Sequence, residues 1–442
     1  MAVSSRQTAY QALMRVEEEL SYSNIILNSV LRNEMSERDK RFVSALFYGV
    51  IEKKLLLDYN LSQFSDRPVN TLAKEVLMIL RMGLYQLFFM NGVPASAAVN
   101  ESVRLCKVNQ LYSAAPFVNA VLRAASKAEN IRLPDKRKGK NKYLSIKYSC
   151  PEGIIRLWRQ SYGDELTEGM LSVLDGRPPI TARVNTLKIT PCALAERLTK
   201  SGVCASISAI LENGIELKDT GSVEDLDEYK EGLFHIQDTA SQLCCELLEA
   251  QKGQTVTDAC SAPGGKAFTI AEIMDNTGKI IACDLYRHRL ALVEKGADRL
   301  GINIISVMQA NSAERQELPQ ADRILCDVPC SGLGIIRRKP ELRYKDDCGT
   351  ETLPKLQYEI LCSSAAALKS GGLLIYSTCT LNPAENGHNI RKFLDENKDY
   401  EPYPIRLPEG IRRCIDEPEN ELTLFPQING TDGFFISVIK RK

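Results

Sequence analysis

The chain has 442 residues, of which 44% are hydrophobic, and its 56 basic residues balance its 56 acidic residues. This length predicts two or three domains, and the zero net charge means that any nucleic-acid-binding surface must be local. The 14 cysteines are scattered without a Cys-x-x-Cys pair, and there are only 3 histidines, which argues against a disulfide framework and a zinc site. The N-terminus lacks the apolar core of a signal peptide, and no apolar run is long enough to span a bilayer. We therefore expect a cytoplasmic protein with reduced thiols, no metal and no membrane segment.

Residues 1–128 carry apolar side chains three and four positions apart, as in Ala9, Leu13 and Val16, which predicts a helical bundle. Ser36 is a candidate N-cap for the helix that starts in "SERDKRF". The stretch "LAKEVLMILRMGLYQLFFM" is apolar on nearly all sides and predicts a central helix of that bundle.

Residues 129–144 form a basic linker, in which five of the eight residues from Asp135 to Lys142 are Lys or Arg. Two interpretations stay open, a solvated linker and a phosphate-contacting segment. Residues 145–235 alternate short β-like runs with one helical segment opened by Pro191. This pattern predicts a small α+β module.

Residues 236–442 alternate strand-like and helical segments, from "TVTDAC" to "GFFISVIKRK". This alternation predicts a mostly parallel, doubly wound α/β sheet, in which ligands bind beyond the carboxyl ends of the strands. Each motif described below follows one of those strands.

The first motif is "DACSAPGGK", residues 258–266, in which a Gly-Gly pair between strand and helix lets a ligand approach the backbone. It is neither a Walker loop nor a G-x-G-x-x-G turn, so pyrophosphate binding is poorly supported. Asp284 ends the next strand, where a carboxylate can hold both hydroxyls of a ribose or, alternatively, cap the following helix.

The second motif, "DVPCSGLG", places Asp327 and Cys330 after another strand. The following stretch "IIRRKPELRY" is expected to lie near the same rim, where its basic side chains would suit a polyanionic substrate; they are Arg337, Arg338, Lys339 and Arg343.

The third motif is "YSTCTLNP", which contains Cys379. Free cysteines are usually small buried hydrophobes. Cys330 and Cys379 are exceptions because both follow strand ends, where a thiolate can be exposed and activated.

With these motifs the chain resembles the RNA (cytosine-5) methyltransferases that use S-adenosylmethionine, and most closely the Sun/RsmB family acting on 16S ribosomal RNA. Pro329–Cys330 and Thr378–Cys379 match the family's paired signatures, and residues 258–266 match its glycine loop. The stretches "ARVNTLK", "GLFHIQDTASQL" and "TDGFFISVIKRK" match its flanking blocks. Residues 1–128 resemble the NusB fold in "LRMGLYQLFFM", "AAVNESVRL" and "FVNAVLRA".

The resemblance implies an all-α NusB-like RNA-binding bundle, an RRM-like α+β RNA-recognition module and a Rossmann-like methyltransferase domain. It implies that Cys379 attacks carbon 6 of cytosine, that Cys330 assists loss of the carbon 5 proton and product release, and that Asp327 contacts N3 of the base. The implied S-adenosylmethionine site comprises Cys260, Ser261, Ala262, Pro263, Gly264, Gly265, Lys266, Asp284, Arg289, Asn311 and Asp327. The family often has Asp where Asn311 stands, although an amide oxygen can still accept a hydrogen bond from adenine.

Three alternatives stay open. In the first, the methyltransferase acts on another RNA, such as tRNA. In the second, the chain is a non-catalytic RNA-binding assembly factor. In the third, Cys330 is the nucleophile, as in the DNA-type arrangement, and Cys379 is structural. The intact glycine loop and the presence of both cysteines argue against a non-catalytic factor.

Overall fold

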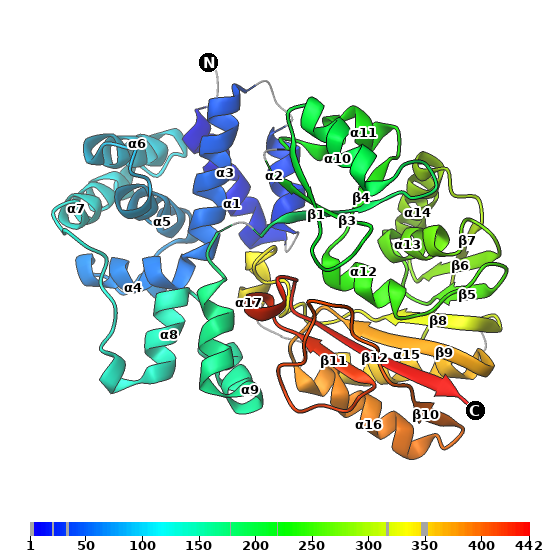
Figure 1. The fold of residues 1–442 in the computed structure, drawn as a ribbon. Helices are drawn as coiled ribbons and strands as arrows, with labels where there is room; N and C mark the ends of the chain where they lie inside the picture. Colours follow the sequence, from blue (N-terminus) through cyan, green and yellow to red (C-terminus); the bar gives the residue numbers. More distant parts are fainter. Residues whose placement is uncertain are drawn as a thin grey trace. The chain divides into compact units, whose positions relative to one another are not determined.

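The computed structural model describes residues 4–19, 22–31, 35–176, 178–218, 220–314, 318–345 and 352–442. Internal contacts divide the chain into two units. The helical unit comprises Met1–Gly176 with Ile336–Asp346, and the α/β unit comprises Arg177–Ile335 with Asp347–Lys442. Figure 1 shows both, coloured along the sequence. No helix within the described ranges is both long and apolar enough to cross a membrane.

The helical unit confirms the predicted bundle. Its main helices are α1 (Ser5–Glu19), α2 (Ser23–Leu31), α3 (Glu37–Glu52), α4 (Lys54–Phe64), α5 (Lys74–Phe89), α6 (Ala95–Val108), α7 (Ala115–Ala125), α8 (Lys140–Tyr148) and α9 (Glu152–Ser172). Ser36 caps α3 as expected, because its hydroxyl accepts the Asp39 N–H at 3.1 Å. The apolar helix α5 is central, with Ile79, Leu80 and Met82 buried.

Two findings differ from the sequence-based expectations for this part of the chain. The β-like runs expected from residue 145 are absent up to Ser172, where α8 and α9 lie instead. Helix α9 contains a kink at Gly163, whose φ of 79° is readily reached only by glycine. Helix α8 already begins at Lys140, within the stretch that we expected to be a linker.

Arg343 gives a third difference from those expectations. It was expected at the rim that carries Asp327 and Cys330, but it is only 1% exposed and lies in the helical unit, as part of the short helix η5 (Pro340–Tyr344). Its guanidinium donates to the carbonyl oxygens of Glu52, Tyr148, Leu174 and Ile336 at 3.3 to 3.5 Å. Three of these carbonyls stand at or just beyond the ends of α3, α8 and α9, where helical carbonyls lack intrahelical partners. Arg343 is therefore a structural anchor and is not available to a polyanion.

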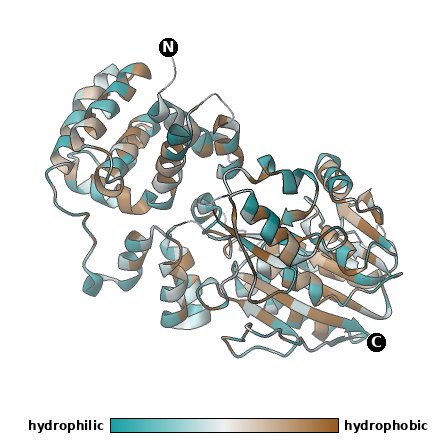
Figure 2. Cartoon of the chain, turned by 45° about the horizontal axis from the view of Figure 1, so that its top comes forward, coloured by the Kyte–Doolittle hydropathy of each residue, from teal (hydrophilic) through white to brown (hydrophobic). Residues whose placement is uncertain are grey.

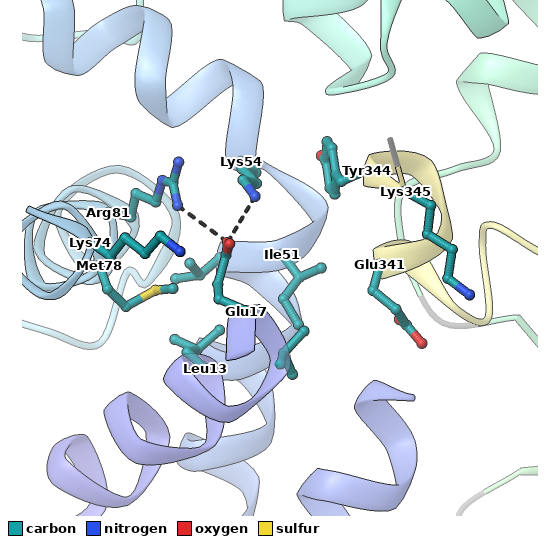
Figure 3. Close-up of a pocket in the computed structure, with 12 residues that line it drawn as sticks. Leu13, Glu17, Ile51, Lys54, Lys74, Met78, Arg81, Glu341, Tyr344 and Lys345 are labelled. Atoms are coloured by element: carbon teal, nitrogen blue, oxygen red, sulfur yellow. Dashed lines mark hydrogen bonds and ion pairs between the residues drawn. The ribbon is translucent and has the colours of Figure 1, made fainter. Parts of the chain in front are cut away.

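A pocket of about 340 Å³ lies in the helical unit (Figure 3). Basic side chains surround it, but Glu17 at its centre accepts from Lys54 at 2.7 Å and pairs with Arg81 at 3.5 Å. Arg81 is also bound at 2.7 Å through two nitrogens by Asp58. Because these charges compensate one another, the pocket alone does not identify an anionic ligand.

The α/β unit begins with a small antiparallel sheet in the order β2-β3-β1-β4. Its elements are β1 (Ile180–Val184), α10 (Pro191–Lys200), β2 (Cys204–Ile207), β3 (Gly214–Lys218), α11 (Asp227–Lys230) and β4 (Phe234–Ile236). The apolar side of α10, including Leu194 and Leu198, packs with Val184, Ile215 and Phe234 of the sheet. This arrangement confirms the predicted α+β module.

The large sheet has the order β10-β12-β9-β8-β5-β6-β7, with β11 paired to β12. Its strands are β5 (Thr255–Asp258), β6 (Lys279–Asp284), β7 (Ile305–Gln309), β8 (Ala321–Asp327), β9 (Leu368–Thr378), β10 (Tyr400–Pro402), β11 (Glu421–Leu424) and β12 (Phe434–Arg441). Strands β5 to β9 pair in parallel, whereas β12 runs antiparallel to β9. The predicted doubly wound sheet is confirmed, with an antiparallel edge.

Helices cover both faces of this sheet. They are α12 (Thr239–Glu246), α13 (Gly265–Ile273), α14 (Arg287–Leu300), α15 (Leu353–Ala366) and α16 (Gly387–Glu396), and the short helix α17 (Pro426–Asn429) follows β11. Successive strand residues face opposite sides, so Ile280 packs in the cluster that contains Leu290 of α14, and Ile281 packs in the one that contains Ile360 of α15. Figure 2 shows these strands as largely hydrophobic. A sheet buried on both faces leaves its strand ends as the place for polar chemistry.

Candidate active site

Four parallel strands bring the predicted site residues to one edge of the large sheet. Strands β5, β6, β8 and β9 end at Asp258, Asp284, Asp327 and Thr378, respectively. Asp327 lies opposite Ser377, and Asp258 lies opposite Leu325. Because the strands are parallel, their carboxyl ends meet at the same edge. The sequence motifs are thus neighbours in space.

The glycine loop turns directly from β5 into α13. Ser261 N–H donates to the Cys283 carbonyl at 2.8 Å, and Gly264 N–H donates to the Ser261 carbonyl at 2.8 Å. Gly264 has a φ of 108°, and a Cβ there would meet the Phe268 ring at 2.5 Å. Only glycine combines this backbone conformation with this close approach. The loop therefore presents backbone rather than side chains at the start of α13.

Unpaired polar atoms line the base of this loop. Within the described residues, neither carboxylate oxygen of Asp258 nor the hydroxyl of Ser261 makes a hydrogen bond of normal geometry, although all three atoms are buried and Ser261 lies close to Asp258. Burial raises the pKa of Asp258 to about 7. A buried polar atom without a partner is costly, so these atoms fit a polar ligand such as the amino and carboxylate groups of S-adenosylmethionine.

Asp284 and Arg289 form the next part of the edge. Asp284 is buried and accepts the Tyr286 N–H at 3.0 Å, and its carboxylate pairs with Arg289 at 3.1 Å. Arg289 also donates to the Ala262 carbonyl at 3.0 Å, so it joins the glycine loop to the end of β6. Of the two roles considered for Asp284, a side-chain cap on the first turn of α14 is not observed. Asp284 instead holds the N–H of Tyr286, the residue before α14, and its contact with a ribose stays a prediction.

Asn311 lies just beyond β7 and has local partners. Its side-chain oxygen accepts the Ala313 N–H at 3.2 Å, and its amide nitrogen donates to Glu314 at 2.8 Å. The preceding Ala310 N–H donates to the Asp284 carbonyl at 3.2 Å, which keeps the two predicted cofactor contacts on adjacent strand ends. Cys260, in contrast, packs against the cluster on the α15 side of the sheet, and burial raises its pKa well above its usual value.

Asp327 is held by two partners. Lys266 donates to one carboxylate oxygen at 2.6 Å, and the Ser377 hydroxyl donates to the other at 2.8 Å. Burial opposes the charge of Lys266, but the neighbouring Asp327 carboxylate outweighs it and raises the lysine pKa. Lys266 is thus part of the glycine loop that is predicted to bind the cofactor. Its ammonium group, however, holds the carboxylate of Asp327, which is predicted to bind the base.

The two predicted catalytic cysteines lie side by side. The Sγ atoms of Cys330 and Cys379 are 3.2 Å apart, within hydrogen-bond reach for a thiol. The hydrogen bond with Cys379, followed by burial, raises the pKa of Cys330 well above its usual value. Either thiol can donate in this contact. The raised pKa favours the protonated form of Cys330, and the assignment of Cys379 as the nucleophile stays a prediction.

The backbone between the two cysteines is closely packed. Gly334 N–H donates to the Cys379 carbonyl at 3.0 Å, and Gly433 N–H donates to the Gly334 carbonyl at 3.0 Å. A Cβ on Gly334 would lie 1.9 Å from the Gly433 carbonyl oxygen. The glycine is required because three backbone segments meet here.

Sequence reasoning missed two other features near the site. Glu385, six residues after Cys379, is buried and binds Ser331, which follows Cys330. Its position in "NPAEN" gave no signal, because a surface carboxylate in a turn has the same pattern.

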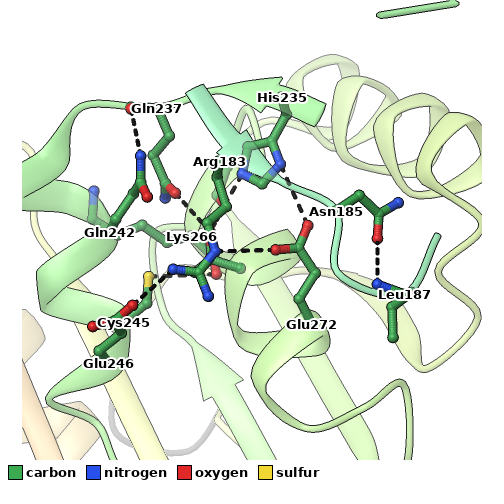
Figure 4. A network of polar contacts seen from close by, with 12 residues as sticks. Arg183, Asn185, Leu187, His235, Gln237, Gln242, Cys245, Glu246, Lys266 and Glu272 are labelled. Atoms are coloured by element: carbon green, nitrogen blue, oxygen red, sulfur yellow. Dashed lines mark hydrogen bonds and ion pairs between the residues drawn. The ribbon is translucent and has the colours of Figure 1, made fainter. Parts of the chain in front are cut away.

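The second missed feature is a buried polar network that joins the small module to α13 (Figure 4). Arg183 of β1 donates to Glu246 at 2.8 Å and to Glu272 at 3.3 Å. Burial, reinforced by the charge of Arg183, lowers the pKa of His235 of β4 to about 3, so this histidine is neutral. Thr269 donates to Gln237 at 2.6 Å. The network fixes the small module against the helix that begins with the glycine loop.

Comparison with known proteins identifies the family. Residues 245–440 match the model for the 16S rRNA methyltransferase RsmB/F, residues 3–127 match the NusB family, and residues 150–224 match the ferredoxin-like domain of RsmF/B-like methyltransferases. The "Probable ribosomal RNA small subunit methyltransferase B" of Bacillus subtilis is 36% identical over 99% of both chains. "Ribosomal RNA small subunit methyltransferase B" of Escherichia coli O1:K1 is 29% identical over 99% of this chain and 98% of its own. The crystal structure of PH0851 matches 100% of both chains with a TM-score of 0.84 at 25% identity. This chain belongs to the RsmB family of 16S ribosomal RNA methyltransferases.

Proposed function

We propose that this protein transfers a methyl group from S-adenosylmethionine to carbon 5 of a cytosine in 16S ribosomal RNA, with Cys379 as the nucleophile. The contact that carries the proposal is the 3.2 Å separation of the Cys379 and Cys330 sulfur atoms beside Asp327. The family supplies the reaction and the RNA class, and the arrangement of side chains supports the assignment of roles. A 16S rRNA substrate also implies a cytoplasmic enzyme.

Carbon 5 of cytosine is too weak a nucleophile to attack a methyl group directly. Addition of the Cys379 thiolate to carbon 6 converts the ring to an enamine with nucleophilic character at carbon 5, so covalent catalysis replaces one difficult step by easier ones. As the adduct forms, N3 takes up a proton from solvent, and Asp327, already oriented by Lys266 and Ser377, accepts a hydrogen bond from that N3–H. After methylation, the carbon 5 proton passes to solvent with the assistance of Cys330, and the C5–H electron pair forms the C5–C6 double bond. The Cys379–C6 bond breaks, Cys379 leaves as a thiolate, and loss of the N3 proton to solvent gives the product.

The glycine loop, Asp284 and Asn311 would hold S-adenosylmethionine. The bound cofactor supplies a methyl group on a positively charged sulfur. The backbone of residues 260–266 would bind the methionine portion, Asp284 the ribose hydroxyls and Asn311 the adenine amine. Arg289 contributes by joining Asp284 to the loop at Ala262. The target base must leave its stack to reach Cys379, because carbon 6 of a stacked base is inaccessible to a thiolate.

RNA containing 5-azacytosine tests the nucleophile, because it stops the reaction at the covalent stage. Wild-type protein should form a complex that resists denaturing electrophoresis, Cys379→Ala should form none, and Cys330→Ala should retain the complex. A stable adduct in Cys379→Ala that disappears in Cys330→Ala would reverse the two roles. Wild-type protein that binds RNA but neither methylates it nor binds S-adenosylmethionine would favour a non-catalytic assembly factor.

Comparison of substrates tests the RNA class. The protein should methylate a 16S rRNA transcript or small-subunit particle, and bisulfite sequencing should show one modified cytosine in it. Methylation of tRNA, with 16S rRNA left unmodified, would contradict the substrate assignment while leaving the chemistry of Cys379 intact.

A further inference from the structure

We propose that Glu385 is a positioning residue for the methyl-transfer reaction, holding the loop that carries Cys330 against the loop that carries Cys379. The inference rests on the proposed function, because it assumes that both thiols act on the base. Glu385 lies in the turn Pro383–Glu385 and is 0% exposed. It contacts neither sulfur, so it acts through the residues that follow each cysteine.

Four donors converge on the Glu385 carboxylate. One oxygen accepts the Ser331 N–H at 2.9 Å and the Gln357 amide at 2.8 Å, and the other accepts the Ser331 hydroxyl at 2.6 Å and the Asn382 amide at 2.9 Å. Hydrogen bonds to a charged acceptor are stronger than neutral ones, and a buried carboxylate needs several of them. Its negative charge is therefore matched by neutral donors from both loops and α15.

The direction of one hydroxyl bond follows from this arrangement. Ser331 and Thr380 have their hydroxyl oxygens 2.7 Å apart. Because the single Ser331 proton is donated to Glu385, Thr380 must donate to Ser331. Ser331 directly follows Cys330, and Thr380 directly follows Cys379. The chain Thr380–Ser331–Glu385 thus joins the two loops one residue away from each thiol.

The neighbouring contacts make the arrangement rigid. Gln357 donates through the same amide to the Pro329 carbonyl at 2.9 Å, on the other side of Cys330. The Tyr376 hydroxyl donates to the Glu385 carbonyl at 2.6 Å, so the acid is also held from within β9. With both loops fixed to one carboxylate, the 3.2 Å sulfur separation is set before substrate binds.

The central variant is Glu385→Gln, which keeps the shape of the side chain. It replaces one carboxylate oxygen, an acceptor, by an NH2 group that would face the donors of Ser331, Gln357 or Asn382. Glu385→Asp keeps the charge and shortens the reach, and Ser331→Ala removes one donor without touching the acid. Glu417→Gln is the matched control, since Glu417 also accepts an N–H and a hydroxyl from one residue, Thr423, at 3.0 and 2.8 Å. Glu417 is remote in sequence from both cysteines.

Two measurements on the full chain separate positioning from folding and from the proposed function. Hydrogen exchange of the free protein, which needs neither RNA nor S-adenosylmethionine, should show faster exchange in residues 327–335 and 377–386 of Glu385→Gln and no change there in Glu417→Gln. Single-turnover methylation should be slowed by roughly 100-fold in Glu385→Gln, the scale expected for a misplaced reacting group. The dissociation constants for RNA and cofactor should stay near wild-type values, and Glu385→Asp should recover part of the rate.

The proposal is overturned if a folded Glu385→Gln protein methylates RNA at the wild-type rate, or if its exchange is unchanged in both segments. If Glu385→Gln does not fold, Ser331→Ala replaces it as the test of the proposal. We expect a smaller loss of methylation rate in Ser331→Ala, and a wild-type rate in this variant would overturn the proposal. Failure of the proposed function would look different: wild-type protein would not methylate RNA at all, while the exchange difference between the Glu385 and Glu417 variants would persist.

Discussion

The sulfur atoms of Cys330 and Cys379 lie 3.2 Å apart, although 48 residues of chain, residues 331–378, separate them. Strands β8 and β9 are adjacent and parallel, so the residues that follow them meet at one edge. The contact allows one thiol to donate a hydrogen bond to the other, and together with burial it raises the pKa of Cys330. It also makes the two cysteines chemically distinguishable.

Replacement of Cys330 by alanine is expected to slow product release rather than adduct formation. Loss of an assisting proton-transfer group typically costs roughly 100-fold or more, so methylated RNA should remain attached to Cys379. Denaturing electrophoresis with unmodified RNA should reveal this covalent complex in the variant, whereas wild-type protein should show little of it. Rapid turnover by Cys330→Ala without an accumulated complex would contradict the assigned role.

The pKa of Asp258 predicts a specific dependence of stability on pH. Burial raises this pKa to about 7 from a usual value of 3.8, so the folded protein binds the proton more tightly than the unfolded chain. The stabilisation from this group is therefore complete below pH 3.8 and is lost as the pH rises through about 7. In Asp258→Asn, the free energy of unfolding relative to wild type should rise by up to about 1.4 kcal/mol per pH unit in that window.

Urea unfolding at pH 5, 6, 7 and 8 would measure this dependence. Asp322→Asn is the matched control, because the hydrogen bonds from Lys369 and the Thr255 N–H lower the pKa of Asp322. Its difference from wild type should be flat over the same range. An equally flat difference for Asp258→Asn would show that this carboxylate is not held in its neutral form.

Replacement of Gly334 by alanine is expected to displace Cys379. The new Cβ would meet the Gly433 carbonyl oxygen at 1.9 Å and the Cys379 carbonyl oxygen at 2.9 Å, and backbone atoms cannot rotate away. We expect a loss of roughly 1–3 kcal/mol in unfolding free energy and a large fall in methylation rate. Gly153→Ala is the control, because nothing lies within 4 Å of its Cβ position, and it should leave the rate unchanged. Wild-type activity in Gly334→Ala would show that the loop tolerates displacement.

The basic stretch around α8 is expected to bind RNA phosphates through its exposed lysines. Lys138 and Lys142 are exposed, whereas Lys140 pairs with Asp164 at 2.6 Å. Lys138→Glu with Lys142→Glu should weaken RNA binding and make the slope of log K against log salt shallower by about 1 for each phosphate that these lysines neutralise. Cofactor affinity should not change. An unaltered slope would favour the solvated-linker interpretation. Lys398→Glu in the α/β unit provides the charge control.

The alternation of strands and helices made the large sheet predictable, because apolar runs such as those of β6 and β9 are typical of strands that are buried on both faces. It also placed Asp284, Asp327 and Cys379 at one edge, since each follows such a run. The α8–α9 region was not predictable in the same way. The stretch "KYLSIKYS" has an alternating pattern, but Leu144 and Ser145 are buried in a helix within the bundle.

Contacts between distant side chains could not be predicted from one sequence. Nothing in "RRKPELRY" shows that Arg343 satisfies carbonyls in the helical unit while Lys339 lies 3.9 Å from the Tyr22 ring. In the same way, the pairing of Glu385 with Ser331 depends on how two loops meet. The contacts of Arg343 and of Glu385 depend on the tertiary structure, whereas local sequence patterns specify only the helices and strands.

The anchor at Arg343 affects the order in which the protein can fold during synthesis. The chain passes between the two units after residues 176, 335 and 346. Glu52, Tyr148 and Leu174, whose carbonyls accept hydrogen bonds from Arg343, leave the ribosome early. Arg343 itself is made only after residues 177–335 have been synthesised. Domains usually fold in the order in which they are synthesised. Here the N-terminal bundle is completed only after strands β1 to β8 of the second unit have emerged, so the two units mature together during translation.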